Sequence, residues 1–289
     1  MNRAYAEVIG DPIVQSKSPA IHGFWLKETG IDAEYRAEHV TSDNLGEYLA
    51  SRRKDQGWRG CNVTMPHKQT VIPHLDRLDP PAARIGAVNT IIPEGGALVG
   101  YNTDASGFLE PLRPILAETH LFRMARVLGT GGAARAIVSA LAEQGMVIVL
   151  AGRDLAKARE LLDQLAPPSE GSAIEHHVVD IAAFASPTDF AFDEREYCLD
   201  LIVNASSLGM VGQPPLDFDW SHAPPRSVVY DIVTSPLETA FLQAGRRAGF
   251  RTVDGLAMLI GQADHAFRRF FSVEPPRHVD GALRAKLAG

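Results

Sequence analysis

Residues 126–134 read RVLGTGGAA, and this stretch decides the fold. Apolar residues before Gly129 predict a strand, residues 135–144 predict a helix, and residues 146–151 predict a second strand. Glycines let the backbone approach a pyrophosphate, which the free N–H groups of a helix N-terminus attract. A tight turn without a ligand is the alternative for a lone glycine cluster of this unusual spacing. The order of strand, turn, helix and strand favours the βαβ unit of a dinucleotide-binding domain.

The end of the second predicted strand carries charges of both signs. An acid at this position usually binds the ribose 2'-hydroxyl of NAD, whereas arginine accommodates the 2'-phosphate of NADP. Here Arg153 and Lys157 are basic and Asp154 is acidic. Two cations outweigh one carboxylate beside a nearly divalent phosphate, so we predict NADP, with NAD as a secondary cofactor. Solvated basic residues that open a helix are the alternative.

The first hundred residues alternate between strand-like and helix-like segments. Residues 5–10 and 33–39 and the segment that ends at Thr64 predict strands, whereas 18–29 and 43–53 predict helices. This pattern indicates an α/β domain that precedes the glycine turn. After the turn, strands are expected at 199–204 and 228–232. Apolar residues recur at helical spacing from Leu256 to Phe271.

Residues 62–68 read NVTMPHK and place a lysine beside polar side chains. Pro66 fixes its own backbone φ angle and favours an extended conformation at Met65. Amide, hydroxyl and amine groups are thereby presented together, and Lys68 is our candidate for the catalytic acid/base. An exposed lysine after a turn is the ordinary alternative when Thr-x-Pro-x-Lys occurs in isolation.

Three further segments carry polar residues that suit a small hydroxylated ligand. They read GDPIVQSKSP at 10–19, GAVNT at 86–90 and GYNTDASGF at 100–108. In this order, the four segments resemble those of shikimate dehydrogenases. The resemblance runs nearly end to end, through the glycine turn, NASSLGM at 204–210 and DGL at 254–256 before Gln262.

The resemblance implies a two-domain α/β enzyme. Residues 1–104 would form the substrate-binding and catalytic domain, and 105–254 the Rossmann-type domain that binds NADP. Residues 255–289 would form C-terminal helices that return to the first domain. The implied reaction is the reversible NADPH-dependent reduction of 3-dehydroshikimate to shikimate, in the biosynthesis of chorismate and aromatic amino acids.

The resemblance also implies roles for individual residues. Lys68 would move the hydroxyl proton, and Asp104 would hydrogen-bond both the lysine and a substrate hydroxyl. Other substrate contacts would come from Ser16, Ser18, Thr64, Asn89, Thr234 and Gln262. Closure of a turn is the alternative for Asn89. The cofactor would contact Gly129, Thr130, Gly131, Gly132, Ala133, Arg153, Lys157, Ile232 and Gly255.

Several positions depart from the family pattern, among them Gly152, where asparagine is usual, and Asp154, where a small hydroxyl residue is usual. Thr234 stands where a tyrosine commonly contacts the substrate carboxylate, Gln15 where a histidine is frequent, and Ala257 where glycine is usual. These departures leave the reaction class intact but open the question of the substrate. A quinate/shikimate dehydrogenase with relaxed cofactor use is therefore the nearest alternative. A folate-linked dehydrogenase and a catalytically silent nucleotide-binding regulator on the same fold are more distant ones.

Composition excludes several other classes. A formal charge of -7 on 289 residues argues against a nucleic-acid surface. No apolar run reaches the ~18 residues of a membrane span, and the first residues lack the pattern of a signal peptide. Cys61 and Cys198 show no metal-ligand spacing, so no metal site is expected. We predict a cytoplasmic monomer or homodimer with a small-molecule substrate.

Overall fold

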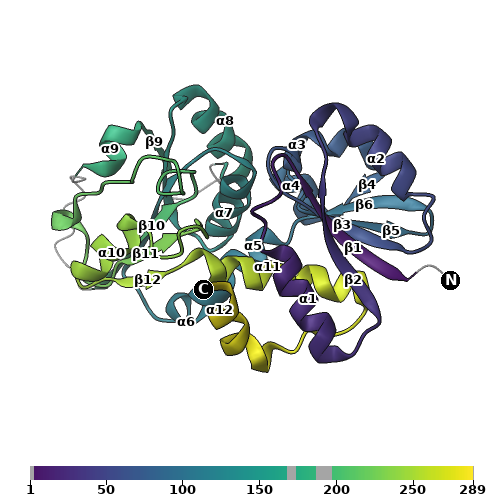
Figure 1. The fold of residues 1–289 in the computed structure, drawn as a ribbon. Coiled ribbons are helices and arrows are strands. Elements are labelled where there is room, and N and C mark those ends of the chain that lie inside the picture. Colours follow the sequence, from purple (N-terminus) through teal and green to yellow (C-terminus); the bar gives the residue numbers. More distant parts are fainter. Residues whose placement is uncertain (1–2, 168–173, 187–196, 289) are drawn as a thin grey trace. The chain divides into compact units, whose positions relative to one another are not determined.

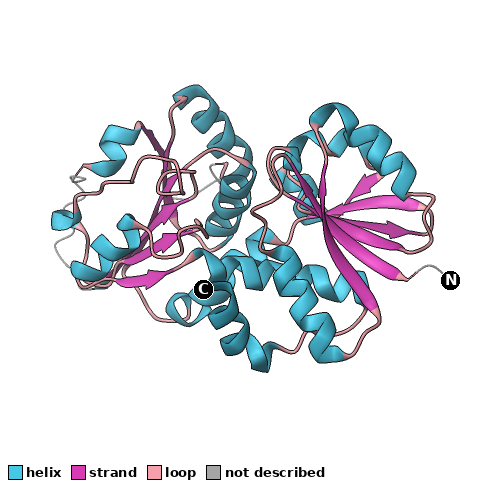
Figure 2. Ribbon diagram, in the orientation of Figure 1, coloured by secondary structure: helices cyan, strands magenta, loops and turns pink. Residues whose placement is uncertain are grey.

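The computed structural model describes residues 3–167, 174–186 and 197–288 (Figure 1). Within it the chain forms two compact units, one of residues 1–107 and 259–289 and the other of residues 108–258. Figure 2 shows that each unit has a sheet with helices beside it. The predicted α/β class is confirmed.

The first unit is built on a mixed six-stranded sheet with the order β2-β1-β3-β5-β6-β4. Strand β1 pairs in parallel with β2 and β3, whereas β5 runs antiparallel to β3 and β6. Its apolar side chains pack into a core that includes Ile9, Trp58 and Ile91. The strands are β1 (Ala4–Gly10), β2 (Ala33–His39), β3 (Trp58–Val63), β4 (Arg77–Leu78), β5 (Thr90–Glu94) and β6 (Ala97–Tyr101).

Helices from both ends of the chain complete this unit. Phe267 of α11 packs against His22 and Trp25 of α1, and Lys17 Nζ donates a hydrogen bond of 2.8 Å to Leu287 O of α12. The predicted return of the C-terminal helices is therefore confirmed. The helices are α1 (Ser18–Thr29), α2 (Leu45–Arg52), α3 (His67–Thr70), α4 (Pro80–Ile85), the first part of α5 (Asp104–Leu109), most of α11 (Gly255–Phe271) and α12 (Asp280–Ala288).

The second unit has an all-parallel sheet with the order β12-β11-β10-β7-β8-β9. This is the strand order of a Rossmann-type domain, with β7 as its first strand. The strands are β7 (Phe122–Leu128), β8 (Val147–Ala151), β9 (His177–Val179), β10 (Cys198–Asn204), β11 (Val228–Asp231) and β12 (Arg251–Val253). The helices are α6 (Arg113–Leu116), α7 (Gly132–Glu143), α8 (Leu155–Leu165), α9 (Ile181–Ala185) and α10 (Ala240–Arg247).

Short 3-10 helices connect several of these elements. They lie at Ser42–Asn44, Ile72–His74, Glu110–Leu112, Trp220–His222 and Arg277–Val279. The predicted helix over 43–53 thus begins with a 3-10 turn and becomes α-helical at Leu45.

A buried carboxyl group joins the loops that follow β10 and β11. Asp231 Oδ1 accepts hydrogen bonds from Asn204 Nδ2 (3.0 Å) and from the backbone N–H of Val233 (3.0 Å). Its Oδ2 accepts a hydrogen bond of 2.7 Å from Thr239 Oγ1. Burial raises the pKa of Asp231 to about 6, although these donors lower it in part. Ionised Asp231 therefore costs stability while the carboxyl group organises the loops.

We expect Asp231→Asn to remove this cost. A carboxyl group whose pKa is higher in the fold binds its proton more tightly there, so the wild-type protein loses stability as pH rises from about 4 to about 6. The amide cannot titrate in this range. Relative to wild type, the variant should gain up to about 3 kcal/mol between pH 4 and pH 7.5, measured as free energies of unfolding in urea.

Asp163→Asn, at an exposed position of α8, is the control and should show no such gain. An Asp231→Asn effect that is equal at both pH values would contradict the titration argument.

Candidate active site

The backbone around Lys68 is fixed on both sides. His67 is buried, and its Nε2 lies 2.6 Å from Val40 O. The carbonyl oxygen of Lys68 accepts a hydrogen bond of 2.7 Å from the N–H of Val88, in the loop that leads to β5. The short helix α3 therefore starts in a defined place, and the lysine side chain leaves from an anchored point.

Asp104 begins α5 and is anchored in a similar way. Its N–H donates to Asn102 Oδ1 (3.0 Å), and Asn102 Nδ2 in turn donates to Ala87 O (2.9 Å). Asp104 Oδ2 accepts a hydrogen bond from Lys68 Nζ, which makes a close ion pair. Only 15% of the lysine side chain and 5% of the aspartate side chain are exposed. The predicted pair is thus formed and largely screened from bulk water.

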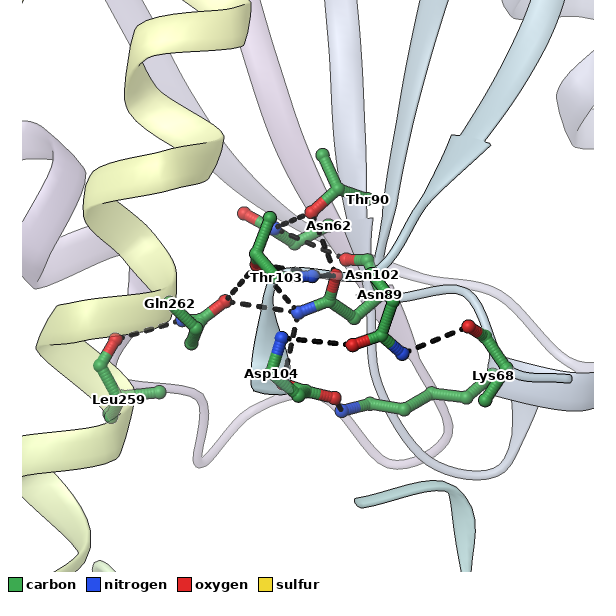
Figure 3. Close-up of polar contacts among 10 residues, drawn as sticks. Asn62, Lys68, Asn89, Thr90, Asn102, Thr103, Asp104, Leu259 and Gln262 are labelled. Atoms are coloured by element: carbon green, nitrogen blue, oxygen red, sulfur yellow. Dashed lines mark hydrogen bonds and ion pairs between the residues drawn. The ribbon is translucent and has the colours of Figure 1, made fainter. Parts of the chain in front are cut away.

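Asn89 holds the other oxygen of this carboxylate. Its Nδ2 donates to Asp104 Oδ1 at 2.9 Å and to Thr103 Oγ1 at 2.8 Å, while its Oδ1 accepts from the N–H of Thr103 at 2.8 Å. Gln262 Oε1 lies 3.4 Å from Asn89 Nδ2, and Gln262 Nε2 donates to Leu259 O. Figure 3 shows the contacts of this cluster, in which Lys68 and Asn89 contact Asp104 and Gln262 contacts Asn89. One amine, one carboxylate and two amides therefore meet in a single cluster.

Ser16 and Thr64 lie in two loops that contact each other, and Ser18 is the first residue of α1. The N–H of Asp11 donates to Met65 O at 3.0 Å. A methyl group on Gly10 would lie 2.6 Å from Thr64 Cγ2, so these loops approach too closely for a side chain at that position. Ser16 Oγ accepts a 3.3 Å hydrogen bond from the N–H of Ser18. Within the described residues, no hydrogen bond joins the hydroxyl groups of Ser16, Ser18 or Thr64 to the cluster around Asp104, although Thr64 precedes Lys68 in the same segment.

Sequence analysis did not identify the inner residues of this site. Asn62 is buried on β3, and its Nδ2 donates to Asn89 O (3.2 Å) and to Thr90 Oγ1 (3.0 Å). Thr90 Oγ1 in turn donates to Asn89 Oδ1 at 3.1 Å. Both residues stood inside the quoted motifs, but nothing in the sequence showed that they pair across β3 and β5.

Thr234 belongs to the second unit, in the loop that follows β11. The structure places it half-buried, one residue after the N–H that donates to Asp231. Its predicted contact with the substrate carboxylate stays a prediction.

The glycine turn follows β7 at the carboxyl edge of the second sheet. Gly129 has φ +125°, and a Cβ atom there would lie 2.6 Å from Ala205 O, so only glycine fits this position. A Cβ atom on Gly131 would meet no atom within 4 Å, which leaves open space beside the start of α7. Gly132 and Ala133 form the first turn of α7, whose N–H groups have no acceptor within the helix. This turn fits the pyrophosphate of a dinucleotide.

The other predicted cofactor residues lie at the same edge. Thr130 packs close to Gly152, which follows β8. A Cβ atom on Gly152 would lie 3.0 Å from Thr130 Cγ2. Ile232 donates its N–H to Asn204 O (3.1 Å), and a Cβ atom on Gly255 would lie 2.6 Å from Ile232 O. The loops after β7, β8, β10 and β11 are thus held together, as expected for a dinucleotide site at the carboxyl ends of parallel strands.

In the charged loop after β8, the side chain of Asp154 has a structural role. Asp154 is the N-cap of α8, and its Oδ1 accepts a hydrogen bond of 3.0 Å from the N–H of Lys157. Arg153 and Lys157 are exposed on either side of this cap. One carboxylate oxygen is therefore engaged by the helix, while the two cations are open to an anionic ligand.

Neither a metal site nor a membrane span emerges from the described residues. Within them, no group of three or more His, Cys, Asp or Glu side chains could hold a metal ion. No helix among them is long and apolar enough to cross a membrane.

Comparisons with known proteins show which proteins this chain resembles. Residues 8–91 match the family described as "Shikimate dehydrogenase substrate binding domain". A shikimate dehydrogenase (NADP(+)) of Sphingopyxis alaskensis is 48% identical over 286 residues, which cover 98% of this chain and 96% of that protein.

Two solved structures extend the comparison. Shikimate 5-dehydrogenase from Thermus thermophilus, in complex with NADP(H) and shikimate, has 31% identity and a TM-score of 0.80 and covers 98% of this chain and 99% of its own. Quinate dehydrogenase from Corynebacterium glutamicum, in complex with NAD, has 30% identity and a TM-score of 0.80 with the same coverage.

The charged loop generates a prediction about cofactor choice. Arg153→Ala should weaken NADP binding by roughly tenfold and NAD binding much less, because only NADP carries the 2'-phosphate. Asp154→Ser should keep the helix cap, remove a negative charge and shift preference further toward NADP. The measurement is the ratio of kcat/KM values for the two cofactors, with Arg159→Ala on the same helix as control. Equal changes for both cofactors would show that this loop does not read the phosphate.

Proposed function

The chain belongs to the shikimate dehydrogenase family, and from this premise we propose that Lys68 and Asp104 are the catalytic residues of its reaction. That reaction is the reversible NADPH-dependent reduction of 3-dehydroshikimate to shikimate, a step in chorismate biosynthesis. The observation that supports the proposal most directly is the close ion pair between the two side chains, beside two amides in a cluster that is nearly closed to solvent.

NADPH, when bound, supplies the hydride that reduces the substrate carbonyl carbon. The ammonium group of Lys68 donates a proton to the oxygen of this carbonyl as it becomes a hydroxyl. In the oxidising direction the neutral amine accepts that proton. A lysine suits this task because its compact ammonium group has three N–H donors, so it can bond to substrate while it bonds to Asp104.

Asp104 and Asn89 set the geometry for this transfer. Asp104 Oδ2 accepts a hydrogen bond from the lysine, and its Oδ1 accepts one from Asn89. Because both oxygens are engaged, the carboxylate cannot rotate without losing a hydrogen bond. Asp104 would contact a ring hydroxyl of the substrate as well, so the substrate is oriented by the group that orients the lysine.

Neutral donors provide the remaining recognition in this proposal. Ser16 and Ser18 bind the substrate carboxylate, while Thr64, Asn89 and Gln262 bind ring hydroxyls. The loops that carry Ser16 and Thr64 are held together by the Asp11 to Met65 hydrogen bond. Short side chains on anchored backbone suit a ligand that must adopt one pose. Thr234 stands where the family commonly has a tyrosine that contacts the substrate carboxylate. The missing phenol hydroxyl would weaken substrate binding.

The cofactor site in this proposal comprises the glycine turn, the loop after β8 and the backbone near Ile232. Gly129, Thr130, Gly131, Gly132 and Ala133 hold the pyrophosphate. Arg153 and Lys157 hold the 2'-phosphate, and Ile232 and Gly255 contact the nicotinamide end.

Quinate oxidation is the second candidate activity. It is favoured by the likeness to a quinate dehydrogenase and by Thr234, which leaves more room than a tyrosine. Quinate differs from shikimate by an added hydroxyl on a saturated ring, so a wider pocket would admit it. The paired Lys68 and Asp104 argue against a catalytically silent protein. A cytoplasmic location and a monomeric or homodimeric state stay predictions.

We expect Lys68→Ala to lower kcat by at least ~100-fold while shikimate affinity changes far less, as for loss of a general acid/base. Asp104→Asn should reduce kcat and raise KM together, because Asp104 is assigned contacts with lysine and substrate. Both are measured by nicotinamide absorbance with shikimate and NADP. Lys27→Ala, an exposed lysine on α1, serves as control. Near-normal turnover of Lys68→Ala would remove this residue from the mechanism.

A separate prediction concerns Thr234. We expect shikimate to be preferred over quinate, since the serines and the ring-facing residues are retained. Thr234→Tyr should lower KM for shikimate by up to roughly tenfold if the phenol regains one hydrogen bond of about 1.4 kcal/mol, with little change in kcat. Thr234→Phe supplies the ring without the hydroxyl and should not reproduce the gain. A wild-type kcat/KM for quinate at or above that for shikimate would reject the preference.

A further inference from the structure

A buried tyrosine on β2 is connected to the catalytic pair through side-chain hydrogen bonds. Tyr35 OH donates to Asn62 Oδ1 of β3 at 2.5 Å. Strand β1 lies between β2 and β3, and Tyr35 is in register with Ala6, whose small side chain is on the same face. The phenol therefore reaches across β1 to contact Asn62.

Every hydrogen bond that continues from this contact has a defined direction. Because Asn62 Oδ1 accepts from the phenol, its Nδ2 is the group that faces Thr90 Oγ1 at 3.0 Å. Thr90 has one hydroxyl proton, which it donates to Asn89 Oδ1 at 3.1 Å.

Asn89 connects Thr90 to the carboxylate of Asp104. With its Oδ1 turned toward Thr90, its Nδ2 faces Asp104 Oδ1 at 2.9 Å. Lys68 Nζ donates to the other oxygen of Asp104. The sequence of donors thus runs from a tyrosine in the core to the acid/base pair, and the backbone N–H of Thr103 also fixes the direction of the Asn89 amide.

The aromatic surroundings hold the tyrosine ring in place. The ring of His22 stacks on that of Tyr35, with 4.0 Å between centroids and 5° between planes, and Phe270 lies 6.2 Å away. Burial lowers the pKa of His22 to about 3 and raises the pKa of Tyr35 well above its ordinary value. Both rings are therefore neutral at working pH, and the phenol remains a donor throughout.

We propose that Tyr35 is a positioning residue for the reaction, acting through Asn62, Thr90 and Asn89 on Asp104 and Lys68. The inference rests on the proposed function of that pair. Without the phenol, Asn62 Oδ1 loses its donor from β2, and the side chain is held through the hydrogen bonds of its Nδ2 to Asn89 O and Thr90 Oγ1. Asn62 can then shift, and Thr90 and Asn89 can shift with it. Because Asn89 Nδ2 is the donor to Asp104 Oδ1, this shift would displace Asp104 from the lysine and from the substrate.

The test begins with Tyr35→Phe, which keeps the ring and its stacking on His22. We expect kcat/KM for shikimate to fall about tenfold, equivalent to about 1.4 kcal/mol, while KM for NADP stays within about twofold. Tyr48→Phe is the matched control. Tyr48 is also buried in this unit, but its hydroxyl faces Glu7 at 3.3 Å, outside the donor sequence. Its kcat/KM should stay within about twofold of wild type.

A second variant separates positioning from a general loss of packing. Thr90→Val breaks the next hydrogen bond in the sequence and should also cost about tenfold. If both residues act through one path, kcat/KM of the Tyr35→Phe/Thr90→Val double variant should be about equal to that of the less active single variant. Independent structural damage would instead multiply to about a hundredfold.

Three outcomes would overturn the proposal. They are Tyr35→Phe activity within about twofold of wild type, an equal loss in Tyr48→Phe, and multiplicative losses in the double variant. Failure of the proposed function has a different signature, since Lys68→Ala would then keep its turnover. An inactive Lys68→Ala together with a fully active Tyr35→Phe would reject only the role of Tyr35.

Discussion

The ion pair between Lys68 and Asp104 is the constraint around which the first unit is arranged. Both side chains are largely removed from solvent, and loss of either partner would leave a charge with little water around it. The surrounding groups respond to this constraint. Asn89 engages the free carboxylate oxygen, and backbone hydrogen bonds fix the segments that carry Asp104 and Lys68. This rigidity suits the proton transfer that we propose for Lys68.

In the second unit, the proposed cofactor site depends mainly on the close approach of backbone segments. Gly129 and Gly255 stand where a side chain would collide with neighbouring carbonyl oxygens, so the loops at the carboxyl edge can close on one another. An aspartate at the position of Asp154 can either bind the ribose of NAD or cap the helix that follows. Its carboxylate caps α8, which is compatible with NADP because the cations beside it remain exposed.

Much of this arrangement could be predicted because it depends on local patterns. The glycine turn between two apolar segments identified the βαβ unit, and the order of short motifs identified Lys68 and Asp104. The roles of Asn62, Thr90 and Tyr35 could not be predicted, because they depend on strand order and register. Residues 62 and 90 meet only when β5 pairs with β3, and Tyr35 meets Asn62 only across β1. The cap formed by Asp154 depended on a side-chain direction that sequence does not show.

Chemical rescue tests the central claim, that Lys68 transfers the proton, most directly. Lys68→Ala would be assayed with shikimate and NADP in the presence of small primary amines of graded basicity. The account predicts that amines restore turnover in a saturable way and that the restored rate depends on their basicity, as expected for a general acid/base. Absence of rescue by every amine, in a variant that still binds shikimate, would contradict the assignment of proton transfer to Lys68.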